Sequence, residues 1–92
     1  MDSVRFELPT HSAAAALWQH LHADRNAWTE PRHEAWLVFA ELHEADDLAV
    51  LLRCAEAWLA TTRLGAIRFS VDDREYVLAA GEVEWSRLDA AA

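Results

Sequence analysis

The hydrophobic pattern at the start of the chain predicts a strand followed by a helix. Residues 3–8 alternate between apolar and polar side chains, which is the period of a half-buried strand. After Pro9, apolar residues recur at spacings of three and four, so we expect a helix that ends near Asp24. Thr10 and Ser12 precede the apolar stretch, and either hydroxyl can cap the N-terminus of this helix.

The middle of the chain predicts two more strands and a second helix. Residues 27–30 have strand character and lead into a turn over 30–32, so we expect a short edge strand there. Residues 35–40 form a nearly continuous apolar run, rich in aromatic and β-branched side chains, which predicts the central strand. From Glu44 the period is helical again, and a leucine-rich stripe predicts a helix that continues to about Thr62.

The last third of the chain has the pattern of a β-hairpin. Gly65 is expected to end the second helix, after which apolar and polar residues alternate over 66–71. A turn at 72–73 and a return strand over 75–80 complete the hairpin. A short helix over 82–89 can follow it.

The order of these elements is βαββαβ with one added strand, which matches a ferredoxin-like α+β sandwich with both helices on one face of the sheet. If residues 27–30 form a loop instead, the order becomes βαβαββ with a closing helix, which resembles the thioredoxin fold. That resemblance stops at topology, because Thr10-His11-Ser12 stands where the redox motif Cys-x-x-Cys would begin the first helix. We therefore expect no thiol-disulfide chemistry and favour the ferredoxin-like order.

Length and composition favour a single folded domain over residues 1–92. With 92 residues, 53% of them hydrophobic and 26% charged, the chain can bury one core but cannot divide into two folding units. Its formal net charge is -8 and it contains no lysine, so nucleic acid and anionic membrane surfaces are poor partners. No apolar run approaches the roughly 20 residues that span a bilayer, and the N-terminus lacks the pattern of a signal peptide. We therefore expect a cytoplasmic protein.

The histidines are not spaced as a metal site requires. His20 and His22 are two positions apart on a predicted helix and point in different directions. His33 and His43 bracket the central strand and lie too far apart to share an ion. We expect all five histidines, His11 included, to be solvated or to cap helices, and we predict no metal site.

Carboxylates and the single cysteine also have structural explanations. Glu41, Glu44, Asp46 and Asp47 cluster where the central strand meets the second helix, but a helix N-terminus favours acidic residues and no calcium-binding loop is present. Cys54 lies within a helical apolar pattern, where a thiol packs as a small hydrophobe. Two glycines cannot build a phosphate-binding loop, so we expect neither a nucleotide nor another cofactor.

The central strand indicates an interaction surface on the second face of the sheet. If alternate residues from Trp36 onward point into the core, Leu37 and Phe39 must point outward among charged neighbours. In a monomer with helices on one side of the sheet, these two side chains would remain in water. An apolar stripe with a charged rim is typical of an interface. The candidate interface residues are Leu37, Phe39, Arg5, Arg68, Trp28 and Trp85.

Two functions are compatible with these features. The leading hypothesis is a non-catalytic interaction or regulatory module that self-associates through its sheet face, with an immunity, inhibitor or adaptor protein for a basic partner as a narrower version. The alternative is a small cofactor-independent enzyme in which two such sheets pack as a dimeric α+β barrel around an apolar pocket. That enzyme needs a polar group inside the pocket, whereas Arg5 and Arg68 can equally be solvated or paired across strands. The segment 83–88 can also fold across this face within one chain.

Overall fold

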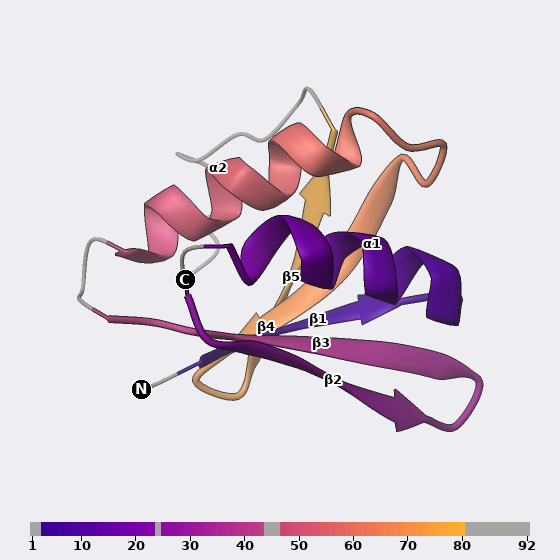
Figure 1. Ribbon diagram of the computed structural model, residues 1–92, viewed down its shortest axis with the longest axis horizontal. Helices are drawn as coiled ribbons and strands as arrows, with labels where there is room; N and C mark the ends of the chain where they lie inside the picture. Colours follow the sequence, from indigo (N-terminus) through magenta and orange to yellow (C-terminus); the bar gives the residue numbers. More distant parts are fainter. Residues whose placement is uncertain (1–2, 24, 44–46, 81–92) are drawn as a thin grey trace.

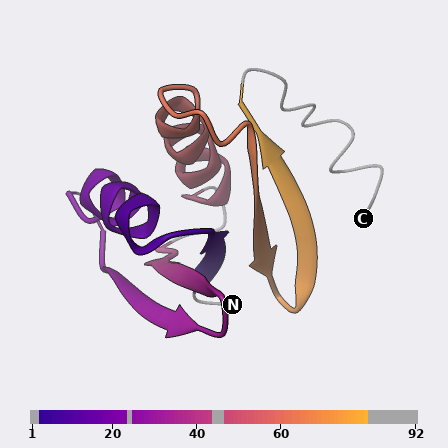
Figure 2. The ribbon, with the colours of Figure 1, turned by 90° about the vertical axis from the view of Figure 1, so that its right-hand side faces the viewer.

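Five strands and two helices form the part of the chain that the computed structural model describes, residues 3–23, 25–43 and 47–80. In chain order they are β1 (Ser3–Leu8), α1 (His11–Leu21), β2 (Ala27–Arg32), β3 (Ala35–Glu41), α2 (Asp47–Leu59), β4 (Ala66–Val71) and β5 (Arg74–Ala79) (Figure 1). The strands make one antiparallel sheet in the order β2-β3-β1-β4-β5. Both helices cover the same face of this sheet, and within the described residues the other face has no helix over it (Figure 2).

The expected α+β class is confirmed, and residues 27–32 form a strand rather than a loop. The thioredoxin-like alternative depended on a loop in this segment, where the structure has a strand instead. The apolar run that we expected to be central is β3, which has a neighbour on each side, but the middle strand of the sheet is β1. Val4, Phe6 and Leu8 of β1 are fully buried. The strand at the centre of the sheet therefore supplies three consecutive inward positions of the core.

The β2–β3 hairpin differs from expectation at its turn. We expected residues 30–32 to form the turn, but β2 continues to Arg32 and the turn follows it, with Glu34 at a φ of 63°. Pro31 is tolerated within the strand because β2 lies at the edge of the sheet and pairs with β3 alone. Glu30 therefore belongs to the sheet and not to a loop.

Helix α2 ends earlier than expected, and threonines rather than a glycine satisfy its last carbonyl groups. The helix ends at Leu59, and the hydroxyls of Thr61 and Thr62 donate hydrogen bonds of 2.6 and 2.7 Å to the carbonyl oxygens of Trp58 and Leu59. Gly65, which we expected to end this helix, lies just before β4 with a φ of 77°. Glycine adopts that conformation without strain, so its role is in the connection and not in the helix.

The C-terminal hairpin is confirmed. Asp72 and Asp73 join β4 to β5 with φ values of 51° and 65°, the pattern of a type I′ turn. The return strand runs from Arg74 to Ala79, one residue earlier than expected at each end. The helix expected over 82–89 lies outside the described residues. Neither helix within the described residues is long and apolar enough to cross a membrane.

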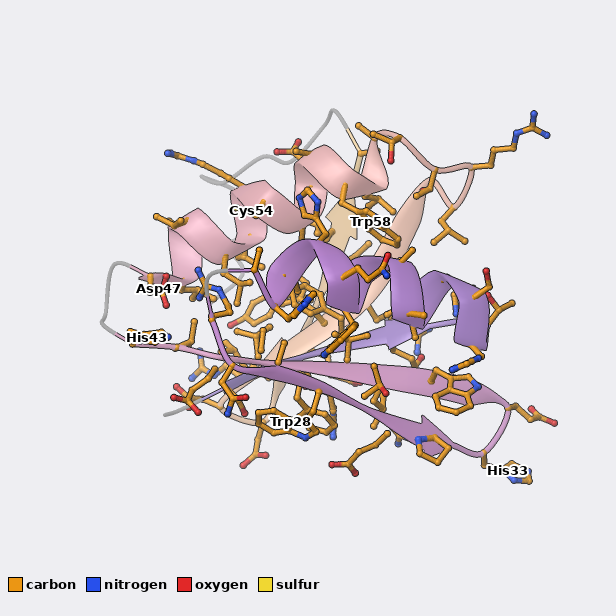
Figure 3. The ribbon with its side chains drawn as sticks, viewed as in Figure 1. Trp28, His33, His43, Asp47, Cys54 and Trp58 are labelled. Carbon is orange, nitrogen blue, oxygen red and sulfur yellow. The ribbon has the colours of Figure 1, made fainter. Side chains whose placement is uncertain are left out.

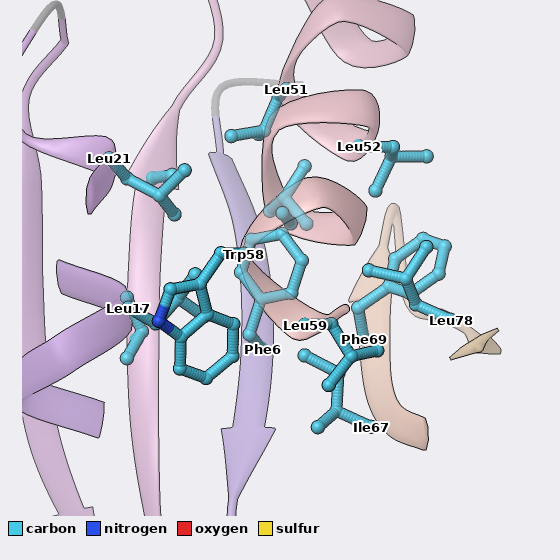
Figure 4. Packing of buried hydrophobic residues seen from close by; sticks show 14 of the residues in the cluster. Phe6, Leu17, Leu21, Leu51, Leu52, Trp58, Leu59, Ile67, Phe69 and Leu78 are labelled. Carbon is cyan, nitrogen blue, oxygen red and sulfur yellow. The ribbon is translucent and has the colours of Figure 1, made fainter. Parts of the chain in front are cut away.

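The core lies between the helices and the sheet, and both layers contribute large side chains to it. Figure 4 shows Trp58 of α2 within one cluster that also holds Leu17 of α1 and Phe6 of β1. Trp58 is 8% exposed, and the other two are fully buried. On the sheet side, the rings of Phe6 and Phe69 lie 6.0 Å apart, which ties β1 to β4.

Thr10, rather than Ser12, caps α1, and the two hydroxyls can be compared directly. The Oγ1 atom of Thr10 accepts a hydrogen bond from the backbone N–H of Ala13 at 3.1 Å. Thr10→Ala should lower the free energy of unfolding by about 1 kcal/mol, because that N–H loses its partner. Ser12→Ala, at an exposed site in the first turn, should change it by less than about 0.5 kcal/mol. Urea unfolding measures both values, and equal losses would contradict this assignment.

Candidate interaction face

The face of the sheet that points away from the helices carries alternate residues of every strand. In the register of the strands, Arg5 of β1 lies between Phe39 of β3 and Ser70 of β4. We call this surface the outer face. Its residues are Ser3, Arg5, Glu7, Trp28, Glu30, Arg32, Ala35, Leu37, Phe39, Glu41, Ala66, Arg68, Ser70, Glu75, Val77 and Ala79.

Five of the six residues that we expected at an interface lie on the outer face, namely Trp28, Leu37, Phe39, Arg5 and Arg68. Figure 3 shows Trp28 on the side of the sheet opposite the helices. Trp85, the sixth, lies outside the described residues. Sequence reasoning missed Glu30 and Arg32, because it assigned them to a turn. Every second residue of a strand points to the same face, so counting from Trp28 would have placed both on the outer face.

Trp28 and Phe39 form a stacked pair at the β2–β3 side of the outer face. They lie opposite each other in the register, with ring centroids 5.2 Å apart and ring planes within 4° of parallel. The indole N–H of Trp28 donates a hydrogen bond of 3.2 Å to the carboxylate of Glu30. Trp28 is nevertheless 37% exposed, and Phe39 is partly exposed. The pair is an accessible apolar surface held in one orientation.

Leu37 is covered within the chain, contrary to our expectation that it would remain in water. Only 8% of its surface is exposed. Arg32 of β2 and Glu7 of β1 form an ion pair of 3.5 Å, and because β3 lies between those strands, their side chains meet above it. Leu37 lies opposite Glu7 in the register and is therefore sheltered by this bridge. The accessible apolar surface shifts to Trp28 and to Val77 of β5, which is 58% exposed.

The other two arginines of the outer face lack such a partner. Among the described residues, the guanidinium groups of Arg5 and Arg68 have neither a hydrogen bond nor an ion pair. Both line a shallow hollow with Ser70, a residue that is 9% exposed, and the space in this hollow is about 10 Å³, room for about one water. The outer face contains three arginines and four glutamates, so its net charge is -1, against -8 for the whole chain.

A buried ion pair fixes the start of the strand that carries Trp28. Arg25 donates hydrogen bonds of 2.6 and 2.9 Å to the two carboxylate oxygens of Asp47, the first residue of α2, and one of 3.2 Å to the carbonyl oxygen of Glu41. The side chains of Arg25 and Asp47 are 4% and 15% exposed. The Arg25 guanidinium holds the pKa of the Asp47 carboxyl below its ordinary value, against the opposing effect of burial. The backbone N–H of His43, at 3.0 Å, lowers this pKa further (Figure 3).

The histidines contact aromatic rings rather than one another. All five are exposed. The ring of His22 stacks on Trp18 at 4.0 Å, and the ring of His11 lies 4.4 Å from that of Trp36. Within the described part of the chain, no three side chains of His, Cys, Asp or Glu come close enough to share a metal ion.

The acidic residues expected to cluster after the central strand are only partly described. Glu44 and Asp46 lie outside the described residues. The Asp47 carboxylate pairs with Arg25, whereas Glu41 accepts from Arg25 through its backbone carbonyl and its carboxylate accepts a hydrogen bond of 3.3 Å from the side chain of Asn26. Cys54 is a free thiol, partly buried on α2.

A hollow of about 380 Å³ opens where β1 ends and where β3 and β4 begin. Apolar side chains of Leu8, Pro9 and Ile67 line it, together with Glu34 and Arg68. Its volume is that of a small-ligand site. Every buried side-chain polar atom in the described part of the chain already has a hydrogen-bond partner, so no buried polar group is left to bind a ligand there.

Comparisons with known proteins add no family to this description. Searches of protein-family models, of curated proteins and of solved structures find no match to the chain. The interpretation of the outer face therefore depends on its own geometry and charge.

Acid should weaken the Arg25–Asp47 pair, and Asp47→Asn should remove that sensitivity. The pKa of Asp47 is lowered in the folded chain. Its ionised form therefore stabilises the fold above the unfolded pKa of about 3.9, and this stabilisation is lost as the pH falls through the lower folded value. At pH 7, Asp47→Asn should reduce the free energy of unfolding by about 2 to 3 kcal/mol, because the buried Arg25 guanidinium loses the charge of the carboxylate that accepts its two hydrogen bonds.

Urea unfolding of wild type and Asp47→Asn over a range of pH values measures this effect. The difference between them should narrow once the pH falls below about 4. Asp73→Asn, which changes an exposed carboxylate in the β4–β5 turn, is the matched control and should keep the acid sensitivity of the wild type. A difference that stays constant from neutral to acidic pH would show that the pair does not titrate in this way.

Proposed function

We propose that the chain is a non-catalytic protein-interaction module that associates with a second copy of itself through the outer face. The observation that supports this most directly is the asymmetry of the sheet. Two helices cover one face, whereas the outer face carries the Trp28–Phe39 stack and the exposed Val77. Full burial of an exposed side chain of this kind contributes about 1.5 to 3 kcal/mol, and a partner that covers the part still exposed gains a fraction of that value for each.

The distribution of charge favours a second copy as the partner. With a net charge of -8, two copies repel each other at long range, and the repulsion is weakest where nearly neutral surfaces meet. The outer face, with its interspersed arginines and glutamates, is such a surface. An immunity, inhibitor or adaptor protein that binds a basic partner is a narrower version of the same module, and it would use acidic residues outside this face.

We also propose that the fold is ferredoxin-like with one strand added. Helix α1 connects β1 to β2, helix α2 connects β3 to β4, and both helices lie on one face of the antiparallel sheet. Strand β5 extends the sheet beyond β4. This inference concerns architecture alone, because one fold can serve many functions.

The enzyme alternative has less support. A dimeric barrel needs a cavity between its sheets with a polar group inside it. The hollow that Arg5 and Arg68 share has space of only about 10 Å³, far below the several hundred Å³ of a small-molecule site. The hollow of about 380 Å³ that Arg68 also lines is large enough, but within the described residues no buried side-chain polar atom lacks a hydrogen-bond partner. No observation among the described residues favours a particular reaction, so we prefer the interaction module.

Phe39→Arg should convert a wild-type dimer into a folded monomer. Phe39 lies on the outer face, so an arginine there adds an unpaired charge to the contact while leaving the core under the helices intact. Val50→Arg is the matched control, because Val50 is 50% exposed on α2 and away from the sheet, and it should leave the mass unchanged. Sedimentation from about 10 to about 500 µM covers the range expected for a weak dimer, and circular dichroism checks the fold.

Two results would count against this proposal in different ways. A wild type that stays monomeric at the highest concentration contradicts self-association. If the segment 83–88 covers the outer face within one chain, Phe39→Arg instead lowers the unfolding free energy and leaves the mass unchanged.

A further inference from the structure

We infer that the second copy packs on the outer face about a two-fold axis that runs across the strands, an inference that rests on the proposed function. Two rows of side chains cross β3, β1 and β4 on this face. The Arg5 row consists of Phe39, Arg5 and Ser70. The Glu7 row consists of Leu37, Glu7 and Arg68. The axis passes between the two rows.

This axis places the Arg5 row of one copy on the Glu7 row of the other. On β1, Arg5 meets the partner's Glu7, which brings opposite charges together. On β3, Phe39 lies over the partner's Leu37 and packs on the aliphatic stems of the Arg32–Glu7 bridge that covers it. On β4, the hydroxyl of Ser70 meets the guanidinium of the partner's Arg68. Because the axis is two-fold, each of these complementary contacts occurs twice.

A two-fold axis that runs along a strand brings like charges together. An axis along β1 sets Arg5 on the partner's Arg5 and Glu7 on the partner's Glu7. An axis along β3 sets Glu7 on the partner's Glu30, because these two residues lie on either side of Leu37 in the register. Like charges in a desolvated contact cost several kcal/mol, so these axes are disfavoured. An axis midway between β1 and β4 sets Arg5 on the partner's Ser70, and one midway between β1 and β3 sets it on the partner's Phe39. Only the axis across the strands gives both charges of β1 an opposite charge.

The two charged groups of β1 are suited to this contact. Arg5 is half-buried, and among the described residues its guanidinium has neither a hydrogen bond nor an ion pair, so its side-chain donors are available. Glu7 already lies 3.5 Å from Arg32, and its two oxygens can accept further bonds from the partner's Arg5. Each charge at the centre of the contact therefore has an opposite charge beside it.

The size of the sheet predicts a weak dimer. Sheets that pack face to face lie about 10 Å apart with their strands within about 30° of alignment, a gap that facing arginine and glutamate side chains can bridge. Five strands, spaced by about 4.8 Å and about 20 Å long, give a contact of at most roughly 1,000 Å² summed over both copies. That area is near the lower limit for specific interfaces, so we expect dissociation in the micromolar range.

Charge reversal on β1 tests the axis. Arg5→Glu and Glu7→Arg each place like charges at both symmetric β1 contacts, so each variant alone should raise the dimer dissociation constant at least about tenfold. An equimolar mixture of the two variants should associate to within about threefold of the wild type, because both β1 contacts then join opposite charges. Sedimentation at physiological salt measures the three constants.

A change in net charge alone should not weaken the dimer to this extent. Arg53→Glu, on the exposed side of α2, changes the charge of the chain as much as Arg5→Glu does, and it should change the dissociation constant by less than about threefold. Glu7→Arg reduces the repulsion between whole chains, so weaker association of that variant would come from the local contact.

The outcomes separate this inference from the function on which it rests. A mixture that stays monomeric, while Phe39→Arg still dissociates the wild type, overturns the axis and leaves the proposed function in place. A monomeric wild type overturns both.

A distance measurement decides the case if Glu7→Arg does not fold. Spin labels are attached at Val77→Cys on β5, in a Cys54→Ser background that removes the only cysteine. The axis across the strands places β5 over the partner's β5, with the labelled backbone positions roughly 12 Å apart. An axis along β1 places β5 over the partner's β2, at more than about 20 Å, and that result would overturn the inference.

Discussion

A sheet that helices cover on one face only must shelter its other face with its own side chains, and much of this structure follows from that constraint. The buried residues of β1 turn toward the helices, so the residues between them emerge on the outer face. Contacts between strands replace a covering helix there. The Arg32–Glu7 bridge passes over β3, and Trp28 stacks on Phe39 of the next strand. The outer face is therefore an apolar surface that charged side chains partly cover.

The Arg25–Asp47 pair applies a related constraint at the edge of the sheet. Strand β2 pairs with β3 alone and contains a proline, so backbone hydrogen bonds hold it weakly. The two hydrogen bonds from Arg25 to Asp47 tie the segment before β2 to the first turn of α2, where a carboxylate also suits the helix dipole. Trp28 follows shortly afterwards in the chain. The position of the exposed aromatic pair therefore depends on a buried contact near the helix layer.

Local periodicity explains which parts of this fold could be predicted from the sequence. Alternation located β1 and the C-terminal hairpin, and the leucine stripe located most of α2. The alternation of successive strand residues between the two faces also placed most of the candidate interface residues on the outer face. The remaining features depend on contacts between distant positions: two neighbouring strands shelter Leu37, and Arg25 is 22 positions from Asp47. The misassigned turn at 30–32 has a local cause, because Pro31 usually interrupts a strand and only an edge position tolerates it.

In the proposed assembly, Arg5 and Glu7 of β1 determine the register in which the two copies pack, whereas apolar contacts determine how tightly they bind. A wholly apolar face of this size would promote unspecific association, whereas interspersed charges keep the free surface hydrated. When two copies meet, the cost of desolvating these charges offsets much of their attraction, so they contribute more to the choice of register than to affinity. Affinity then depends mainly on the packing of Phe39 against the partner's β3, because the same axis sets Trp28 on the partner's Glu30 and Val77 on the partner's Glu75. A contact of this kind forms and dissociates as the protein concentration changes, which suits a regulatory module better than a permanent assembly.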